Sequence, residues 1–266
     1  MFCLLLLSYS AKSFDLTFGF SRLVSIFALY SMSLSIAELI LHWYLIILLI
    51  IMNSSRVVFC DFDGTITTKD TFITVLEKFA PETAARLLPA IFRRELTLKQ
   101  GIDKTLGVIP TRHYSAMVEF IARQPVRPGL KEFINFLNDR QVSFVVISGG
   151  LSSLVTAVLA HNRLLDGVEA IHAGEVDVTG EYLHPYSAIS SDTEFVAKAI
   201  AMKKYPARQK IAIGDSVTDI NMSLAADLVF ARDRLKQYLD DENKAYVEWD
   251  NFFEIRDYLA ASWQKD

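Results

Sequence analysis

The chain has 266 residues, of which 52% are hydrophobic and 22% charged, and its formal net charge is −4. This length supports a substantial apolar core and excludes a peptide hormone or a disulfide-stabilised mini-protein. Because the charge is mildly acidic and no basic stripe is present, we expect a small-molecule ligand and no nucleic-acid partner. The two cysteines, Cys3 and Cys60, offer no disulfide framework, which suits a reducing compartment, and we expect the cytoplasm.

The first 51 residues differ in composition from the remainder. Of residues 1–51, 36 are hydrophobic and only four are charged. The most apolar part, residues 39–52, is shorter than the roughly 20 residues that span a bilayer, and His42 interrupts it. No basic region precedes the apolar start, as a secretory signal requires. Three interpretations stay open: a translation start at Met52, a membrane-associating segment, or a packed helical extension. We expect membrane contact only through this segment.

From residue 56 onward, short apolar runs alternate with helical patterns. Such alternation predicts an α/β fold with a doubly wound, mostly parallel sheet. A segment at 168–186 with hairpin-like alternation is expected to flank this sheet. The expected strands cover residues 56–60, 142–148, 210–214, 228–232 and 245–249.

A helical insertion is expected between the first two strands. Residues 70–127 show helical periodicity without a strand-like run, and Arg127-Pro128-Gly129 marks their end. We therefore divide the body of the chain into a core, residues 52–69 and 128–266, and a helical cap, residues 70–127. Four basic residues of the cap either line its ligand side or form its solvated face: Arg93, Arg94, Lys99 and Arg112.

Acidic residues follow two of the predicted strands. Asp61 and Asp63 lie in the sequence DFDGT, and Asp215 and Asp219 lie in DSVTD. Asp and Gly also form simple turns, which is the plainer interpretation of either segment alone. However, the carboxyl ends of parallel strands meet at one edge of a sheet, where ligands bind. Convergent carboxylates repel one another unless a cation relieves them, so together they predict a Mg²⁺ site.

Phosphoryl transfer is the chemistry that such a site favours. Asp61 is the expected nucleophile, which would form an aspartyl-phosphate. Asp63 lies two residues further on and is the expected general acid and base. For the metal we expect Asp61, Asp63 and Asp215 as ligands, with Asp219 supporting the metal or its waters.

A phosphate-binding group is expected at the end of the second strand. Ser148, Gly149 and Gly150 combine a hydroxyl, backbone N–H groups and a following helix, which is typical of phosphate sites but also of plain connectors. A cation should accompany them. Lys198, in a helical pattern at 192–204, is the best placed candidate, whereas a solvated surface role is the alternative for any helix lysine.

These motifs, in this order, resemble the haloacid dehalogenase (HAD) superfamily of phosphohydrolases. DFDGT matches its nucleophile motif, ISGG its serine motif and GDSVTD its acidic motif. The inserted helices resemble the cap of the branch that includes phosphoserine phosphatase. The resemblance implies a Rossmann-like core, Mg²⁺, a small phosphorylated metabolite as substrate, and phosphate contacts from Thr65, Ser148, Gly149 and Lys198.

Further segments resemble the methionine-salvage phosphatases that act on 2-hydroxy-3-keto-5-methylthiopentenyl-1-phosphate. They include FAP at 79–81, LTLKQG at 96–101 and WDNFFEIRDYL at 249–259. One departure is that residues 188–198, AISSDTEFVAK, lack the cysteines that precede the lysine in that family. Lys198 therefore matches the family lysine only with a gap.

Two other functions stay open. The chain could be a phosphatase of phosphoserine, phosphoethanolamine or phosphocholine, since only the cap selects among substrates. Asp70 matches an acidic residue that phosphoserine phosphatases use for the amino group of the substrate, or it simply caps a helix. From a different class, the chain could be a membrane-tethered, non-catalytic protein that binds a phosphate ligand.

Overall fold

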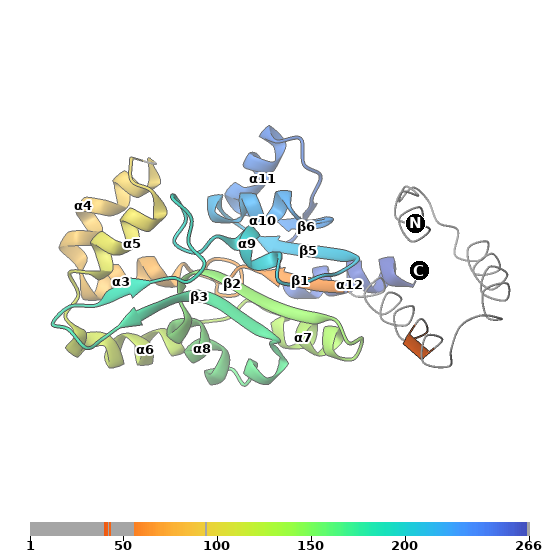
Figure 1. Ribbon diagram of the computed structural model, residues 1–266, viewed down its shortest axis with the longest axis horizontal. Coiled ribbons are helices and arrows are strands. Elements are labelled where there is room, and N and C mark those ends of the chain that lie inside the picture. Colours follow the sequence, from red (N-terminus) through yellow and green to blue (C-terminus); the bar gives the residue numbers. More distant parts are fainter. Residues whose placement is uncertain (1–39, 42, 44–55, 94, 265–266) are drawn as a thin grey trace. The chain divides into compact units, whose positions relative to one another are not determined.

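The structure, a computed structural model, describes residues 40–41, 43, 56–93 and 95–264 (Figure 1). The chain divides into two compact units, residues 1–53 and 54–266, and the following description concerns the second. Apart from 40–41 and 43, the segment 1–51 lies outside the described residues, so its three interpretations remain predictions. None of the described helices is long and apolar enough to cross a membrane.

Within the described part of the chain, seven strands form one sheet in the order β4-β3-β2-β1-β5-β6-β7. All neighbouring pairs are parallel except β3 and β4, which form an antiparallel hairpin at one edge. The sheet therefore confirms the predicted α/β, doubly wound and mostly parallel architecture. The strands are β1 (Arg56–Cys60), β2 (Ser143–Leu151), β3 (Ala170–Asp177), β4 (His184–Tyr186), β5 (Gln209–Gly214), β6 (Leu228–Ala231) and β7 (Val247–Glu248).

Helices cover both faces of this sheet, as the apolar strands require. Figure 1 shows α7 and α8 on one side and α9 and α10 on the other. Helix α12 packs on α7, where the ring of Phe252 stacks on that of Phe133. These helices are α7 (Leu130–Asn138), α8 (Ser152–His161), α9 (Lys198–Met202), α10 (Ile220–Leu224), α11 (Asp233–Asp241) and α12 (Phe252–Trp263), with short 3-10 turns at Leu165–Gly167 and Val217–Asp219.

Four α-helices come between β1 and α7, and they lie toward one end of the sheet (Figure 1). Thr97 begins the third of them with a capping box, since its hydroxyl accepts from the backbone N–H of Gln100 while the Gln100 side chain accepts from Thr97. That these helices act as a cap separate from the core remains a prediction. They are α3 (Thr71–Phe79), α4 (Pro81–Phe92), α5 (Leu98–Leu106) and α6 (Tyr114–Ala122), with a 3-10 turn at Thr111–His113.

Three elements differ from the sequence-based expectation. The last strand is shorter than expected, since β7 covers only Val247–Glu248 of the expected 245–249. Strand β2 continues through Gly149 and Gly150 to Leu151 instead of ending before them. The helix expected over 192–204 is restricted to α9. A hydrogen-bonded turn replaces its first part, because Ser191 N–H donates to the Glu194 carbonyl oxygen at 3.0 Å.

Candidate active site

Asp61 lies at the carboxyl end of the central strand. Its backbone N–H donates to the carbonyl oxygen of Ile213 in β5 at 2.9 Å, so the β1–β5 ladder continues one residue past β1. The side chain is 2% exposed. Because β1 has strands on both sides, this carboxylate is surrounded by the ends of β2 and β5, the place where open α/β sheets bind ligands.

Lys198 is the cation of the cluster. It begins α9 and is 1% exposed. Its ammonium contacts the Asp61 carboxylate and donates to Asp219 Oδ1 at 2.6 Å. Burial lowers the pKa of Lys198, but the two carboxylates outweigh burial and raise it above its ordinary value. The side chain therefore carries a positive charge inside the protein and joins α9 to the ends of β1 and β5.

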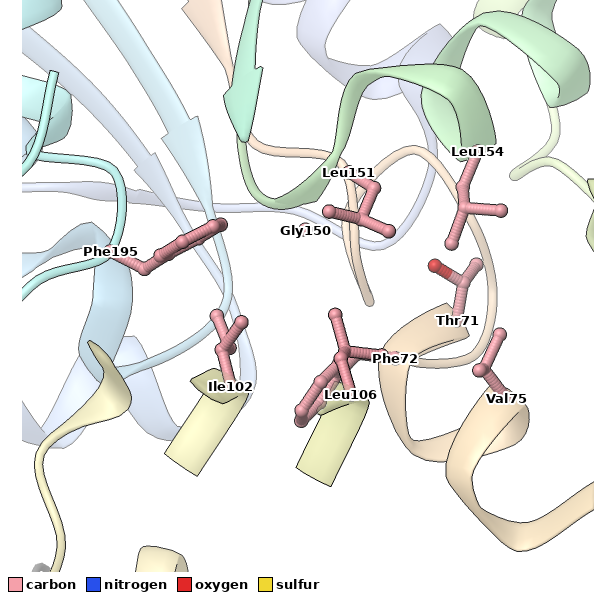
Figure 2. A pocket seen from close by; sticks show the side chains of 9 residues that line it. All are labelled: Thr71, Phe72, Val75, Ile102, Leu106, Gly150, Leu151, Leu154 and Phe195. Atoms are coloured by element: carbon pink, nitrogen blue, oxygen red, sulfur yellow. The ribbon is translucent and has the colours of Figure 1, made fainter. Parts of the chain in front are cut away.

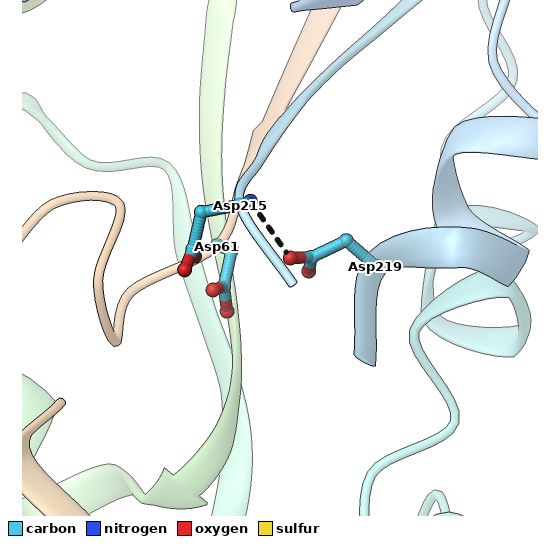
Figure 3. Close-up of side chains that lie close together, drawn as sticks. All are labelled: Asp61, Asp215 and Asp219. Atoms are coloured by element: carbon cyan, nitrogen blue, oxygen red, sulfur yellow. Dashed lines mark hydrogen bonds between the residues drawn. The ribbon is translucent and has the colours of Figure 1, made fainter. Parts of the chain in front are cut away.

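The second carboxylate oxygen of Asp219 stabilises the turn after β5. Asp219 Oδ2 accepts from the backbone N–H groups of Asp215 and Ser216, both at 3.0 Å. Gly214 is required beside it, since a Cβ there would lie 2.6 Å from Asp219 Cγ. Both Asp219 oxygens are thus occupied. Asp215 accepts a hydrogen bond from Thr65 Oγ1 at 2.8 Å and directs its carboxylate toward Asp61 (Figure 3).

Asp61, Asp215 and Asp219 each offer a carboxylate oxygen within 4.8 Å of the others (Figure 3). Burial first, and then the charge of Asp219, raises the pKa of Asp61 well above its usual value, and Lys198 offsets part of this. The same two causes raise the pKa of Asp215 to about 7. One lysine does not neutralise these carboxylates. Hard oxygen donors with excess negative charge fit a Mg²⁺ ion, and the group contains no sulfur ligand.

Asp63 lies beside this cluster and is held at both oxygens. Its Oδ1 accepts from the backbone N–H of Thr71 at 2.8 Å and from the Thr71 hydroxyl. Its Oδ2 accepts from Ser148 Oγ at 3.2 Å, and Ser148 Oγ in turn accepts from Gly150 N–H at 2.9 Å. Sequence reasoning missed Thr71, although Asp70, whose carboxylate accepts from Ile73 N–H at 2.9 Å, marks the start of that helix.

A cavity of about 130 Å³ opens beside the carboxylates. Gly149 lines it, and a Cβ there would meet nothing within 4 Å, so the backbone is accessible to a ligand. Asp70 also lines it, and burial, followed by the charge of Asp63, raises its pKa to about 7. The lining residues are Asp61, Asp63, Asp70, Phe72, Ile91, Leu98, Ile102, Gly149, Asp215, Ser216 and Thr218.

Arg127 supports the loop that follows Asp63. Its guanidinium donates to the carbonyl oxygens of Gly64, at 2.5 Å, and Thr65, at 3.0 Å. The loop turns at Gly64, whose φ is +80° and where a Cβ would lie 2.5 Å from Asp215 Oδ2. Sequence reasoning assigned Arg127 only to a domain boundary, since nothing in its neighbourhood indicates two acceptors some 60 positions earlier.

The eight residues selected from the sequence meet at one edge of the sheet. Of the basic cap residues that the structure describes, Arg93, Lys99 and Arg112 do not line the cavity. Arg93 forms an exposed ion pair with Glu95, and Lys99 lines a separate hollow with His184. Arg94 lies outside the described residues. The eight residues are Asp61, Asp63, Thr65, Ser148, Gly149, Lys198, Asp215 and Asp219.

The family model for haloacid dehalogenase-like hydrolases matches residues 58–223. The chain belongs to this family, and it is a hydrolase by that membership. Among solved structures, it resembles a phosphoserine phosphatase in the form of a phospho-aspartyl intermediate analogue, with a TM-score of 0.60 and 20% identity over 77% of this chain and 99% of the other. A phosphoserine phosphatase from T. onnurineus matches with a TM-score of 0.60 and 15% identity, covering 78% and 95%. These likenesses show the fold.

The curated relatives are more similar in sequence. A 2-hydroxy-3-keto-5-methylthiopentenyl-1-phosphate phosphatase of Microcystis aeruginosa (strain NIES-843 / IAM M-2473) is 49% identical over 205 residues, which cover 77% of this chain and 98% of the relative. The protein of the same name from Bacillus cereus (strain AH820) is 34% identical over 210 residues, 76% of this chain and 94% of the relative. The chain thus spans nearly the whole length of both.

Proposed function

We propose that the chain is a Mg²⁺-dependent phosphomonoester hydrolase that works through an aspartyl-phosphate on Asp61. Its proposed substrate is 2-hydroxy-3-keto-5-methylthiopentenyl-1-phosphate, an intermediate of methionine salvage. One observation carries the proposal: Asp61, Asp63 and Asp215 converge on one cavity in a chain that is 49% identical to a phosphatase named for this substrate.

In the first half-reaction, an oxygen of Asp61 attacks the phosphorus atom. A bond forms between that oxygen and phosphorus, and the bond from phosphorus to the substrate oxygen breaks. Asp63, in its protonated form, gives its proton to the departing oxygen, so that the organic product leaves neutral. Thr71 and Ser148 donate to the two oxygens of Asp63, which fixes the orientation of this side chain in the site.

In the second half-reaction, the ionised Asp63 accepts a proton from a water molecule. The water oxygen forms a bond to phosphorus, and the bond between phosphorus and Asp61 breaks. Inorganic phosphate leaves, and Asp63 regains the proton that it gave away. The same residue therefore acts as acid and then as base, and the chain returns to its starting state.

Lys198, the Ser148 hydroxyl and the exposed backbone at Gly149 are proposed to bind the phosphoryl oxygens, with Thr65 as a further contact. Asp61, Asp63 and Asp215 would hold Mg²⁺, which supplies charge neutralisation between the anionic nucleophile and the anionic substrate. Asp219 suits a supporting role, because its carboxylate accepts from Lys198 and from the backbone N–H groups of Asp215 and Ser216, and so fixes the turn that carries Asp215.

The expected partner is a small phosphorylated metabolite, since the cavity measures about 130 Å³. We further propose that the reaction takes place in the cytoplasm. The buried free thiol of Cys60, directly before the nucleophile, is compatible with a reducing environment.

Phosphate release by the full chain tests this function. Four substrates are compared with and without Mg²⁺: the methylthiopentenyl phosphate, phosphoserine, phosphoethanolamine and phosphocholine. We expect Mg²⁺-dependent turnover with a strong preference for the first. Preference for another substrate would overturn the salvage assignment. A folded chain that binds phosphate but hydrolyses none of the four would instead support a non-catalytic binding protein.

A further inference from the structure

The cavity beside Asp61 has two chemically different sides. Its polar side consists of the carboxylates, Gly149 and the turn after β5. The other side comes from the inserted helices and is formed mainly by four hydrocarbon side chains, which we call the apolar wall: Phe72 of α3, Ile91 of α4, and Leu98 and Ile102 of α5.

Local packing fixes the apolar wall. Leu98 and Ile102 are four residues apart and therefore share one face of α5. Gly101 allows α4 to approach that helix closely, since a Cβ at this position would lie 2.7 Å from Ile91 Cδ1. The capping box at Thr97 fixes the start of α5, directly before Leu98. Ile91 and Leu98 are only half-buried, so they face the cavity without belonging to the core.

Core residues support the wall from behind. Phe72 and Ile102 also border a narrow apolar crevice between α3, α5 and the start of α8, together with Leu106, Leu151 and Phe195 (Figure 2). The crevice has a volume of about 10 Å³, which is the size of about one water molecule. A ligand therefore lies against Phe72 and Ile102 and does not pass behind them.

The composition of the cavity restricts what the far end of a substrate can be. Of the described residues that line it, none is Lys, Arg or His. A carboxylate on the ligand would thus face hydrocarbon and find no cationic partner among the described lining residues, at a considerable desolvation cost. For an uncharged apolar group, burial of its surface against these side chains would favour binding.

We infer that Phe72, Ile91, Leu98 and Ile102 bind the methylthio end of the substrate while the carboxylate side holds its phosphoryl end. This inference rests on the proposed function, and it names the residues that determine specificity. The proposed substrate has phosphate on carbon 1 and methylthio on carbon 5, so its two ends match the two sides of the cavity.

Kinetics with a matched pair of substrates test the inference. The pair is the methylthio compound and an analogue in which hydrogen replaces the methylthio group. Burial of two methylene-sized groups is worth about tenfold in KM. We expect a KM about tenfold lower for the methylthio compound, with similar kcat, because the wall contacts the substrate remote from the reacting atoms.

Leu98→Asn removes one member of the wall without opening the core. We expect it to raise KM for the methylthio compound about tenfold and for the analogue less than twofold. Leu88→Asn is the matched control, since Leu88 is half-buried on α4 but borders a separate surface hollow with Pro81 and Pro89. We expect it to leave both KM values unchanged. Thermal unfolding verifies that each variant folds. If Leu98→Asn does not fold, Leu98→Ala takes its place.

The outcomes separate the inference from the proposed function. Equal KM values for the two compounds in the wild-type chain, or an equal rise for both in Leu98→Asn, would overturn the inference while leaving the hydrolase intact. If the wild-type chain hydrolyses neither compound but accepts phosphoserine or phosphocholine, the proposed substrate itself is wrong.

Discussion

Lys198 shows how much of the site depends on a single buried charge. Its ammonium contacts Asp61 and Asp219, and all three side chains are almost completely buried. Without the lysine, two carboxylates would stay in the protein interior with no positive partner. Removing one member of a buried ion pair is far more destabilising than removing a surface charge, because the remaining charge is uncompensated.

We predict that Lys198→Met lowers the free energy of unfolding by about 3 kcal/mol. Denaturant unfolding measures this change. Inhibition by inorganic phosphate should weaken by at least about tenfold in the same variant, since a direct contact to a phosphoryl oxygen is lost. The exposed Lys203 and Lys204 are controls, and Met at either position should change neither quantity. Unaltered phosphate inhibition in Lys198→Met would remove this lysine from the phosphate site.

The acidic residues and Ser148 could be selected from the sequence because each follows a strand-like run, and strand ends converge in a parallel sheet. The role of Lys198 was harder to predict. Its helix is short, and a turn between Ser191 and Glu194 positions it. The apolar residues of this segment resemble a helical repeat, so their pattern alone does not distinguish the turn from a longer helix.

At the scale of elements, the loop between β1 and α3 depends on support from elsewhere in the chain. Arg127 donates two hydrogen bonds to its carbonyl oxygens and lies 5.4 Å from the centroid of the Trp249 ring. The loop carries Thr65, which donates to Asp215. Arg127 thus fixes the loop that carries Thr65, and through Thr65 it helps to set the distance between this loop and the turn that carries Asp215.

We predict that Arg127→Ala lowers the free energy of unfolding by about 2 kcal/mol, since hydrogen bonds from a charged group are lost. Chemical denaturation measures the loss. Arg123→Ala is the matched control, because the side chain of Arg123 forms an exposed ion pair with Glu119, and it should cost at most about 0.5 kcal/mol. Equal losses for the two variants would show that Arg127 does not support the loop.

Most strands could be predicted because each is a compact apolar run, and β1, β5 and β6 lie within a residue of the expected bounds. Contacts that join distant segments could not be predicted. Thr71 donates to Asp63, and Arg127 donates to Thr65. In both cases the tertiary fold brings the two residues together. Hydrophobic periodicity reports burial along one element, and it contains no information about such pairs.

At the scale of the whole molecule, metal binding should stabilise the fold. Asp61 and Asp219 are buried and Asp215 is half-buried, and each offers a carboxylate oxygen within 4.8 Å of the others. An ion that these carboxylates bind only in the folded state shifts the unfolding equilibrium toward that state. At a Mg²⁺ concentration 100 times the dissociation constant, the gain is about 2.7 kcal/mol.

We predict that Mg²⁺ raises the unfolding temperature of the wild-type chain and that Asp215→Asn abolishes this rise. Differential scanning calorimetry with and without Mg²⁺ measures both. Asp227→Asn should retain the full rise, because Asp227 is exposed and accepts from the backbone N–H of Lys210, near the start of β5, whereas Asp215 follows the end of that strand. A rise of the same size in Asp215→Asn would show that this carboxylate does not hold the ion.

The most direct test of the mechanism is to look for phosphate on the chain itself. The wild-type protein is mixed with the methylthiopentenyl phosphate and Mg²⁺ and quenched with acid during turnover, and its peptides are analysed by mass spectrometry. We predict a covalent phosphate on the peptide that contains Asp61, and none in Asp61→Asn, which should also release no phosphate. Turnover by the wild-type chain with no phosphate on that peptide, or continued turnover by Asp61→Asn, would contradict nucleophilic catalysis by this residue.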